Sequence, residues 1–192
     1  QDHVLTADEV VEATPTGVKG PVVIYDDDHY YLAGALAERL AGEGHDVTLL
    51  TPAAEPCVWT LQTDEHHLVV PRLYEVGVTP VVLRRIERIE SDHLVLRHMQ
   101  SGAETQMTCG TLVLVTSRRA TDGLIRTLPT QPDAMAAAGL ASVTAIGDCL
   151  APGLIVDAVY AGHRYARAFQ APPEGDVRWR RDRVVLNGET RA

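Results

Sequence analysis

The chain has 192 residues and is 45% hydrophobic, which is enough for one large or two small domains with a sizeable core. Its formal net charge of -9 argues against a nucleic-acid partner, because a phosphate backbone needs a basic face. No apolar run approaches the length of a transmembrane helix, so we expect a soluble protein without a membrane partner.

The first 20 residues are expected to be a leading segment and a linker. Thr6 is followed three residues later by Glu9, which is the spacing of a capping box and predicts a short helix over 7–13. Residues 14–20 contain the proline and glycines typical of a linker. The chain opens on Gln1 without an initiator methionine, from which we expect a fragment of a longer protein; a processed terminus is the alternative.

Residues 21–51 have the pattern of a strand, a helix and a second strand. Val22–Tyr25 and Val47–Leu50 are apolar runs typical of buried strands. Between them, leucines recur at every fourth position and predict one buried face of a helix. These leucines are Leu32, Leu36 and Leu40. The unit is the opening half of a dinucleotide-binding fold.

The turn of this unit has the wrong residues for a dinucleotide. It reads Asp26-Asp27-Asp28-His29, and no glycine follows until Gly34. We expect the three carboxylates to satisfy the helix N-terminus and to repel a phosphate. Thr51 occupies the position where an acid usually binds the ribose. The sequence therefore predicts a nucleotide site filled by its own side chains. The alternative is an ordinary acidic helix cap on a fold that never bound a nucleotide.

The remaining elements follow from the same periodicities. A helix is expected to start near Thr63, with Pro71 as a kink or break. Its inward residues are expected to be Leu68, Val69, Leu73 and Val76. Strands are expected over residues 78–83, 85–89, 93–99, 104–108, 112–116 and 143–146, of which the second, third and fourth form an antiparallel meander. Helical or loose segments are expected over 122–128, 131–138 and 154–169, followed by a charged, partly ordered tail.

Two pieces of this sequence resemble a known family. They are the acidic turn YDDDHYY with the following LAERLAGEGHDVTLLTP, and the Gly147-Asp148 pair after an apolar run. Together they resemble the C-terminal region of the trimethylamine dehydrogenase type of NADH:flavin oxidoreductases, relatives of Old Yellow Enzyme and 2,4-dienoyl-CoA reductase. Such proteins have an FMN barrel, an iron–sulfur segment, and an FAD-type domain into which an NAD(P)-type domain is inserted. Neither the barrel nor the cluster cysteines have a counterpart here.

The resemblance implies an α/β fold class in four segments. After the leading segment 1–20, residues 21–110 would be a Rossmann-like, three-layer NAD(P)-binding-like domain with the antiparallel meander. Residues 111–170 would be the C-terminal half of the FAD-type domain, and residues 171–192 a charged tail. The expected partners are the missing barrel and FAD half-domain of the parent, with an electron-transfer protein or a second copy of the chain as further candidates.

The resemblance also implies cofactor-binding residues. Gly147 would let the backbone approach a flavin, and Asp148 would accept a hydrogen bond from a ribityl hydroxyl. The helix that starts at Leu154 and Ile155 would direct its N–H groups at the flavin ring. Thr116 and Arg118 stand where relatives have Thr-Gly-Arg, and Ser117 replaces the glycine between them. The alternatives are a tight turn capped by Asp148 and a solvent-facing Arg118.

No catalytic residue or metal site is expected in this segment. The three cysteines, Cys57, Cys109 and Cys149, are far apart and predict reduced thiols in the cytoplasm. The histidines lack partners at metal-ligand spacing. We therefore expect a flavin-dependent oxidoreductase fragment that holds FAD or an ADP moiety only together with the rest of its parent, which would also carry FMN and an iron–sulfur cluster. The alternative is a non-catalytic docking module with a degenerate dinucleotide-binding fold.

Overall fold

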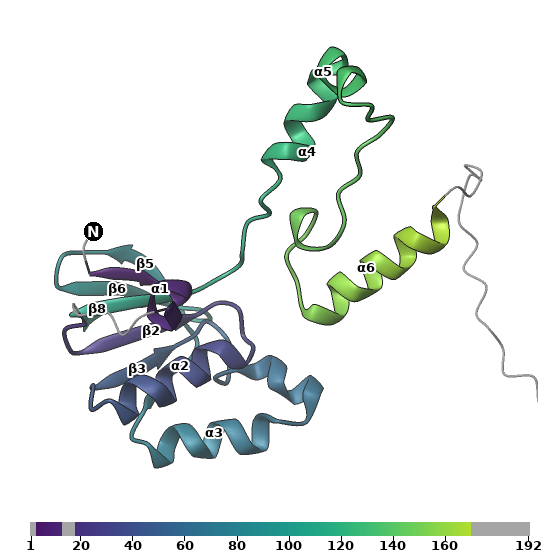
Figure 1. Ribbon diagram of the computed structural model, residues 1–192. Helices are drawn as coiled ribbons and strands as arrows, with labels where there is room; N and C mark the ends of the chain where they lie inside the picture. Colours follow the sequence, from purple (N-terminus) through teal and green to yellow (C-terminus); the bar gives the residue numbers. More distant parts are fainter. Residues whose placement is uncertain (1–2, 13–17, 170–192) are drawn as a thin grey trace, which may run out of the picture. The chain divides into compact units, whose positions relative to one another are not determined.

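A parallel five-stranded sheet organises the N-terminal part of the chain (Figure 1). The computed structural model describes residues 3–12 and 18–169, so most of the expected linker and the charged tail lie outside the described residues. The chain divides into two compact units, Gln1–Ser117 and Arg118–Ala192, and each is described by itself. The sheet belongs to the first unit.

The strands of this sheet come from separate parts of the sequence. They are β1 (Val4–Thr6), β2 (Val22–Asp26), β3 (Val47–Leu50), β4 (Thr79–Val81) and β8 (Thr111–Val115), in the order β1-β8-β2-β3-β4. All neighbours are parallel, and Asp26 at the end of β2 pairs with Val115 at the end of β8. The carboxyl ends of the two central strands therefore lie together.

The two faces of the sheet are buried in two different cores, because successive strand residues point to opposite faces. Val22 and Ile24 belong to the core under the helices, whereas Val23 belongs to the core under the antiparallel meander. In β8, Val113 likewise faces the helices and Leu112 the meander. Helices, parallel sheet and meander form three layers, which confirms the predicted α/β fold class.

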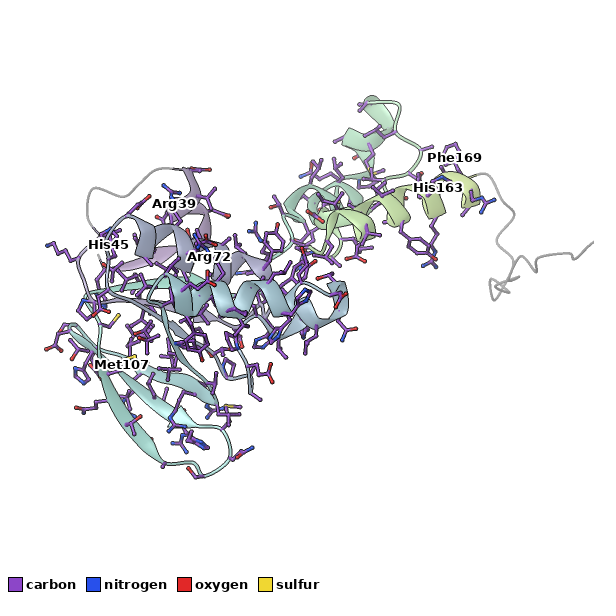
Figure 2. All side chains as sticks on the ribbon, turned by 90° about the horizontal axis from the view of Figure 1, so that it is seen from below. Arg39, His45, Arg72, Met107, His163 and Phe169 are labelled. Atoms are coloured by element: carbon purple, nitrogen blue, oxygen red, sulfur yellow. The ribbon has the colours of Figure 1, made fainter. Side chains whose placement is uncertain are left out.

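Three helices cover one face of the sheet. They are α1 (Ala7–Glu12), α2 (Tyr31–Gly42) and α3 (His66–Glu75), and the 3₁₀ helix η1 (Val58–Thr63) precedes α3. The capping box of α1 is confirmed, because Glu9 accepts the Thr6 N–H at 2.7 Å and donates its own N–H to Thr6 Oγ1 at 3.3 Å. Figure 2 shows Arg39 and Arg72 on this helical side and Met107 on the side of the meander.

Helix α3 differs from the prediction in two ways. It runs through Pro71 to Glu75 without a break. Val69, Leu73 and Val76 pack against the core as expected, but Leu68 is exposed. One residue turns a helix by about 100°, so Leu68 and Val69 cannot share one narrow face.

The antiparallel meander is confirmed. It consists of β5 (Arg84–Ile89), β6 (His93–His98) and β7 (Glu104–Thr108), with a register shift between Ile86 and Arg88. Leu94 and Leu96 of β6 are buried against the parallel sheet. The outer surface carries ion pairs such as Arg97 with Glu104 at 2.9 Å.

In the first unit, the two ends of the segment 21–110 meet at one point. The backbone N–H of Gly110 donates to Pro21 O at 2.8 Å, and Thr111 Oγ1 donates to Lys19 O at 2.8 Å. A Cβ on Gly110 would lie 2.6 Å from Gly20 O, so a side chain does not fit there. Gly110 is thus required by the close approach of the incoming chain.

The described part of the second unit is helical. It contains α4 (Gly123–Thr127), the 3₁₀ helix η2 (Leu128–Thr130), α5 (Pro132–Ala137), the 3₁₀ turn η3 (Gly147–Cys149) and α6 (Ile155–Ala168). The expected strand over 143–146 is not formed. A strand needs a hydrogen-bonded neighbour, and the described residues of this unit offer none. No residue from 118 to 169 is buried.

Candidate functional site

The backbone N–H groups of the acidic turn after β2 all donate to acceptors within the protein. The N–H groups of Asp27 and Asp28 both donate to Val115 O, at 2.9 and 3.2 Å. The N–H of His29 donates to the Asp26 carboxylate at 2.7 Å. A phosphate-binding turn points such N–H groups at the ligand. Three successive donors are therefore unavailable to a pyrophosphate.

Asp26 is the central residue of this turn. Its carboxylate is fully buried and also accepts the backbone N–H of Cys57 at 3.3 Å. Burial raises the pKa of Asp26, and the hydrogen bonds from His29 and Cys57 oppose that effect. The carboxylate therefore joins the turn to the loop after β3.

The prediction that the carboxylates cap helix α2 is wrong. The N-cap residue is Tyr30, and no side chain makes a cap hydrogen bond there. His29 adopts a left-handed φ of 64° and turns the chain before the helix starts. The acidic residues precede the first helical turn, so they cannot reach its N–H groups in the manner of a cap.

Thr51 at the end of β3 is fully buried. Its hydroxyl accepts the N–H of Ala53 at 3.2 Å and lies 3.4 Å from Nδ1 of His29. Thr51, which occupies the position where an acid usually binds the ribose, therefore stabilises the loop that follows β3.

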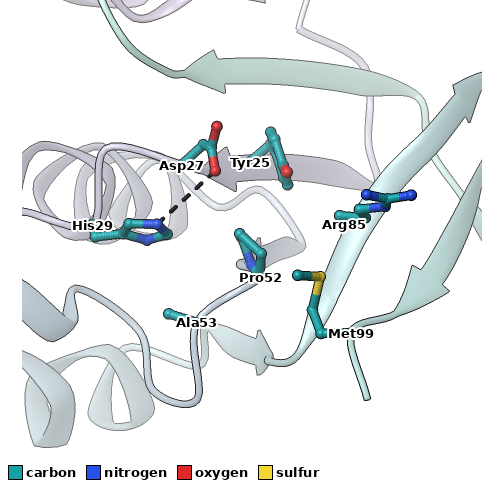
Figure 3. Close-up of a pocket in the computed structure, with 7 residues that line it drawn as sticks. All are labelled: Tyr25, Asp27, His29, Pro52, Ala53, Arg85 and Met99. Carbon is teal, nitrogen blue, oxygen red and sulfur yellow. Dashed lines mark ion pairs between the residues drawn. The ribbon is translucent and has the colours of Figure 1, made fainter. Parts of the chain in front are cut away.

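A pocket of about 460 Å³ lies at the carboxyl ends of β2 and β3. We call it the carboxyl-edge pocket, and its lining residues are Tyr25, Asp27, His29, Pro52, Ala53, Arg85 and Met99. Figure 3 shows Asp27 and His29 on one side of it and Arg85 and Met99 on the other. An open pocket remains at this edge, and side chains of the acidic turn line it. That these side chains take the place of a bound pyrophosphate stays a prediction.

Charges of both signs meet in this pocket. Burial raises the pKa of Tyr25, and the carboxylate of Asp27 adds to the effect, while Arg85 opposes it. Arg85 itself donates to Glu87 from Nε at 3.2 Å and from Nη2 at 3.0 Å. The carboxylate of Glu87 is shared with Arg97, whose Nε lies 3.2 Å from Oε2, so Arg85 keeps part of its positive charge toward the pocket.

The sequence did not point to Arg85 and Met99 as pocket residues. Arg85 is on β5, and Met99 follows β6. The N–H of Leu83 donates to Ala53 O at 2.9 Å, and the N–H of Met99 donates to Leu83 O at 2.9 Å, which fixes both segments beside the loop after β3. The meander was predicted, but its docking on the sheet had no signal in the local pattern.

In the second unit, Gly147 and Asp148 form the 3₁₀ turn before α6. Gly147 has a φ of 61°, which favours glycine, and an added Cβ would lie 3.7 Å from the Ala158 Cβ. The side chain of Asp148 is exposed. The turn thus lies against α6 and leaves its carboxylate accessible.

Helix α6 starts where the sequence predicted it. Leu154 is the N-cap residue, and its N–H donates to Asp157 Oδ2 at 2.9 Å. The side chain of Ile155 is 85% exposed, so this helix start is not covered within the described chain.

The six predicted cofactor-binding residues fall into both units. Thr116 lies directly after β8 in the first unit, and Arg118 opens the second. Gly147, Asp148, Leu154 and Ile155 all lie in the second unit, around the start of α6. A flavin-binding role for these residues stays a prediction.

The described residues contain no group of three or more His, Cys, Asp or Glu side chains placed to hold a metal ion. Within the same part of the chain, no helix combines the length and the apolar character needed to span a membrane.

The fold belongs to the Rossmann-like α/β class. No family model matches the chain. Histamine dehydrogenase from Rhizobium sp. 4-9 superposes with a TM-score of 0.84 and 35% identity, over 90% of this chain and 27% of that chain. The 6-hydroxypseudooxynicotine amine oxidase of Pseudomonas geniculata N1 superposes with a TM-score of 0.79 and 35% identity, over 88% of this chain and 25% of that chain.

A relative found by sequence is also an amine dehydrogenase by name. Dimethylamine dehydrogenase from Hyphomicrobium sp. (strain x) is 33% identical over 198 residues, which cover 94% of this chain and 27% of the relative. The chain is homologous to a part of the trimethylamine dehydrogenase-like amine dehydrogenases, which confirms the resemblance. It spans about a quarter of the length of these relatives.

Proposed function

We propose that this chain is the C-terminal nucleotide-binding region of a flavin-dependent amine dehydrogenase. The observation that carries the proposal is the similarity of 33–35% identity along about nine-tenths of the chain to proteins named for amine oxidation. The intact parent would oxidise a small amine at an FMN barrel and pass the electrons through an iron–sulfur centre. The present segment would supply no catalytic residue to that reaction.

In this proposal, residues 118–169 of the second unit help to complete an FAD-type domain that holds FAD or an ADP moiety, whereas β8, which the predicted boundary at residue 111 assigned to that domain, lies in the sheet of the first unit. The second unit has the properties of half a domain, because large apolar side chains of α6 and its flanks are exposed and no residue from 118 to 169 is buried. These side chains include Leu150, Leu154, Ile155, Val156 and Val159. The missing half-domain of the parent would cover them.

The residues around the start of α6 fit a flavin nucleotide. The left-handed Gly147 leaves room for close approach, and the exposed Asp148 carboxylate is able to accept a hydroxyl hydrogen bond. The positive end of a 14-residue helix stabilises negative charge placed beside it. When bound, the flavin would supply the electron-carrying chemistry.

The first unit would not bind a pyridine dinucleotide. The N–H groups of Asp27, Asp28 and His29 are all used within the protein, and two of these residues bring carboxylates to the same turn. This domain would therefore act as a structural part of the parent.

The test compares the purified chain with the full-length parent. The chain alone is expected to show no saturable binding of FAD, ADP or NADH by fluorescence titration. In the full-length protein, Asp148→Ala is expected to lower the content of bound nucleotide, while the matched Asp133→Ala on exposed α5 leaves it unchanged. Tight binding of FAD by the chain alone, or full nucleotide content in Asp148→Ala, would contradict the proposal.

A further inference from the structure

The carboxyl-edge pocket has the size of a small-molecule site. Its volume of about 460 Å³ lies within the range of roughly 300–1,000 Å³ that is typical of such sites. It lies where the loops after β2 and β3 meet the meander, so three parts of the fold contribute to its wall. The pyrophosphate turn that would make it part of a dinucleotide site is closed by internal hydrogen bonds.

The charges around the pocket favour a cation. Within the described residues, the side-chain carboxylate of Asp27 accepts no hydrogen bond, and the nearest basic side-chain atom is Nε2 of His29 at 3.9 Å. Its side chain is 48% accessible, so it is able to meet a ligand. Arg85 donates two hydrogen bonds to Glu87, a carboxylate that it shares with Arg97. On the side of the pocket opposite to Arg85 (Figure 3), an anion would be repelled by Asp27 and the neighbouring Asp28.

The rest of the lining suits an apolar or aromatic ligand body. Tyr25 supplies a half-buried ring, Met99 a polarizable thioether, and Pro52 a rigid apolar surface. Aromatic faces attract organic cations, and methionine sulfur packs well against aromatic rings. In Figure 3, Tyr25 lies between the Asp27 side and the Arg85 side of the pocket.

We propose that the carboxyl-edge pocket binds an organic ammonium compound with an aromatic or apolar body, the ammonium group facing Asp27 and the body lying between Tyr25 and Met99. This inference rests on the geometry of the first unit and is independent of any flavin site in the second.

The chain offers a direct readout, because it has three methionines and one of them lines the pocket. The methyl carbons of Met99, Met107 and Met135 are labelled with ¹³C in the full chain and assigned with Met99→Leu. Benzylamine, benzyl alcohol, phenylacetate and AMP are then titrated in turn. Benzylamine is expected to shift the Met99 signal in a saturable manner and to leave Met107 and Met135 in place. The alcohol is expected to bind more weakly, and phenylacetate and AMP to leave all three signals unchanged.

Two charge-matched variants separate the pocket from general electrostatics. Asp27→Asn and Asp64→Asn each remove one carboxylate that lies 3.9 Å from a histidine, but Asp64 is on the exposed turn before α3. Asp27→Asn is expected to weaken benzylamine about three- to fivefold, as for a partly exposed ion pair, and Asp64→Asn to have no effect.

Three results would overturn the inference. One is equal or tighter binding of phenylacetate or AMP at Met99. Another is an equal loss of benzylamine affinity in the two aspartate variants. The third is a concerted shift of all three methionine signals, which would mean binding to the general surface.

Discussion

The buried carboxylate of Asp26 accepts a hydrogen bond from the backbone N–H of His29 at 2.7 Å. The same carboxylate accepts the N–H of Cys57 at 3.3 Å. His29 and Cys57 both have left-handed backbone conformations, with φ of 64° and 50°. One side chain therefore holds two left-handed turns, one in the loop after β2 and one in the loop after β3.

We expect Asp26→Ala to destabilise the first unit by about 3 kcal/mol, because it leaves two buried N–H groups without an acceptor. Asp26→Asn keeps one acceptor oxygen and is expected to cost about 1–2 kcal/mol. Urea unfolding measures both values, and Asp46→Ala at an exposed aspartate is expected to stay within about 0.5 kcal/mol of the unmodified chain. An Asp26→Ala chain as stable as Asp46→Ala would show that the two turns hold without the carboxylate.

The stability of the first unit should depend on the protonation of Asp26. Burial raises its pKa in the folded state above the ordinary value of 3.8, so the folded chain binds the proton more tightly than the unfolded chain. The contribution of this tighter proton binding to the free energy of unfolding is fully present below the pKa that Asp26 has in the unfolded chain. It is lost as the pH rises through the pKa that Asp26 has in the folded chain. Relative to Asp26→Asn, the melting temperature of the unmodified chain should therefore fall as the pH rises above the ordinary pKa of an aspartate, about 4. A constant difference would mean that the pKa of Asp26 is not raised.

Gly110→Ala should destabilise the junction where the two ends of the segment 21–110 meet. The new Cβ would lie 2.6 Å from Gly20 O and 2.7 Å from Lys19 O, and both are backbone atoms that cannot turn away. We expect a loss of about 2–3 kcal/mol in the free energy of unfolding. The control is Gly42→Ala at the end of α2, where no atom lies within 4 Å of the new Cβ and alanine is the better helix former. Equal stability of the two variants would contradict this close contact.

The three thiols should react at very different rates. Burial raises the pKa of Cys57 to about 12 and that of Cys109 to about 11, whereas Cys149 is exposed. Because the thiolate is the reactive form, Cys149 is expected to react first with a disulfide reagent in the folded chain. Cys149→Ser should abolish the fast phase, and urea should restore reaction of the other two. A fast phase that survives in Cys149→Ser would mean that a buried thiol is accessible.

The second unit should exchange its amide hydrogens quickly. Slow exchange requires buried, cooperative structure, and none of the residues from 118 to 169 is buried. We expect the amides of α4, α5 and α6 to exchange within the shortest labelling time and those of β2 and β8 to be protected. In the longer protein that we propose, the helix α6 should gain protection. Strong protection of α6 in the chain alone would show that the unit has a core of its own.

The elements with a clear period were predictable from the sequence. The meander, the strand β8 and the helix α6 all formed near their expected positions, because local hydrophobic spacing decides them. The capping box of Thr6 and Glu9 formed as well, since its two partners are three residues apart.

The failures involve partners that a local pattern does not contain. Residues 143–146 have the composition of a strand, but a strand also needs a neighbour to pair with. Asp26 was expected to face a helix end, but its acceptor atoms face His29 and Cys57, and the latter is 31 positions away. The pocket residues Arg85 and Met99 reach the acidic turn through tertiary packing of the meander.

The adjoining contacts of Pro21 with Gly110 and of Lys19 with Thr111 have an architectural consequence. The entry and exit of the 21–110 segment lie side by side, so excising it requires a bridge of a few residues rather than a long spacer. The segment therefore enters and leaves through a single narrow gateway, beside which β8 joins the same sheet as β2.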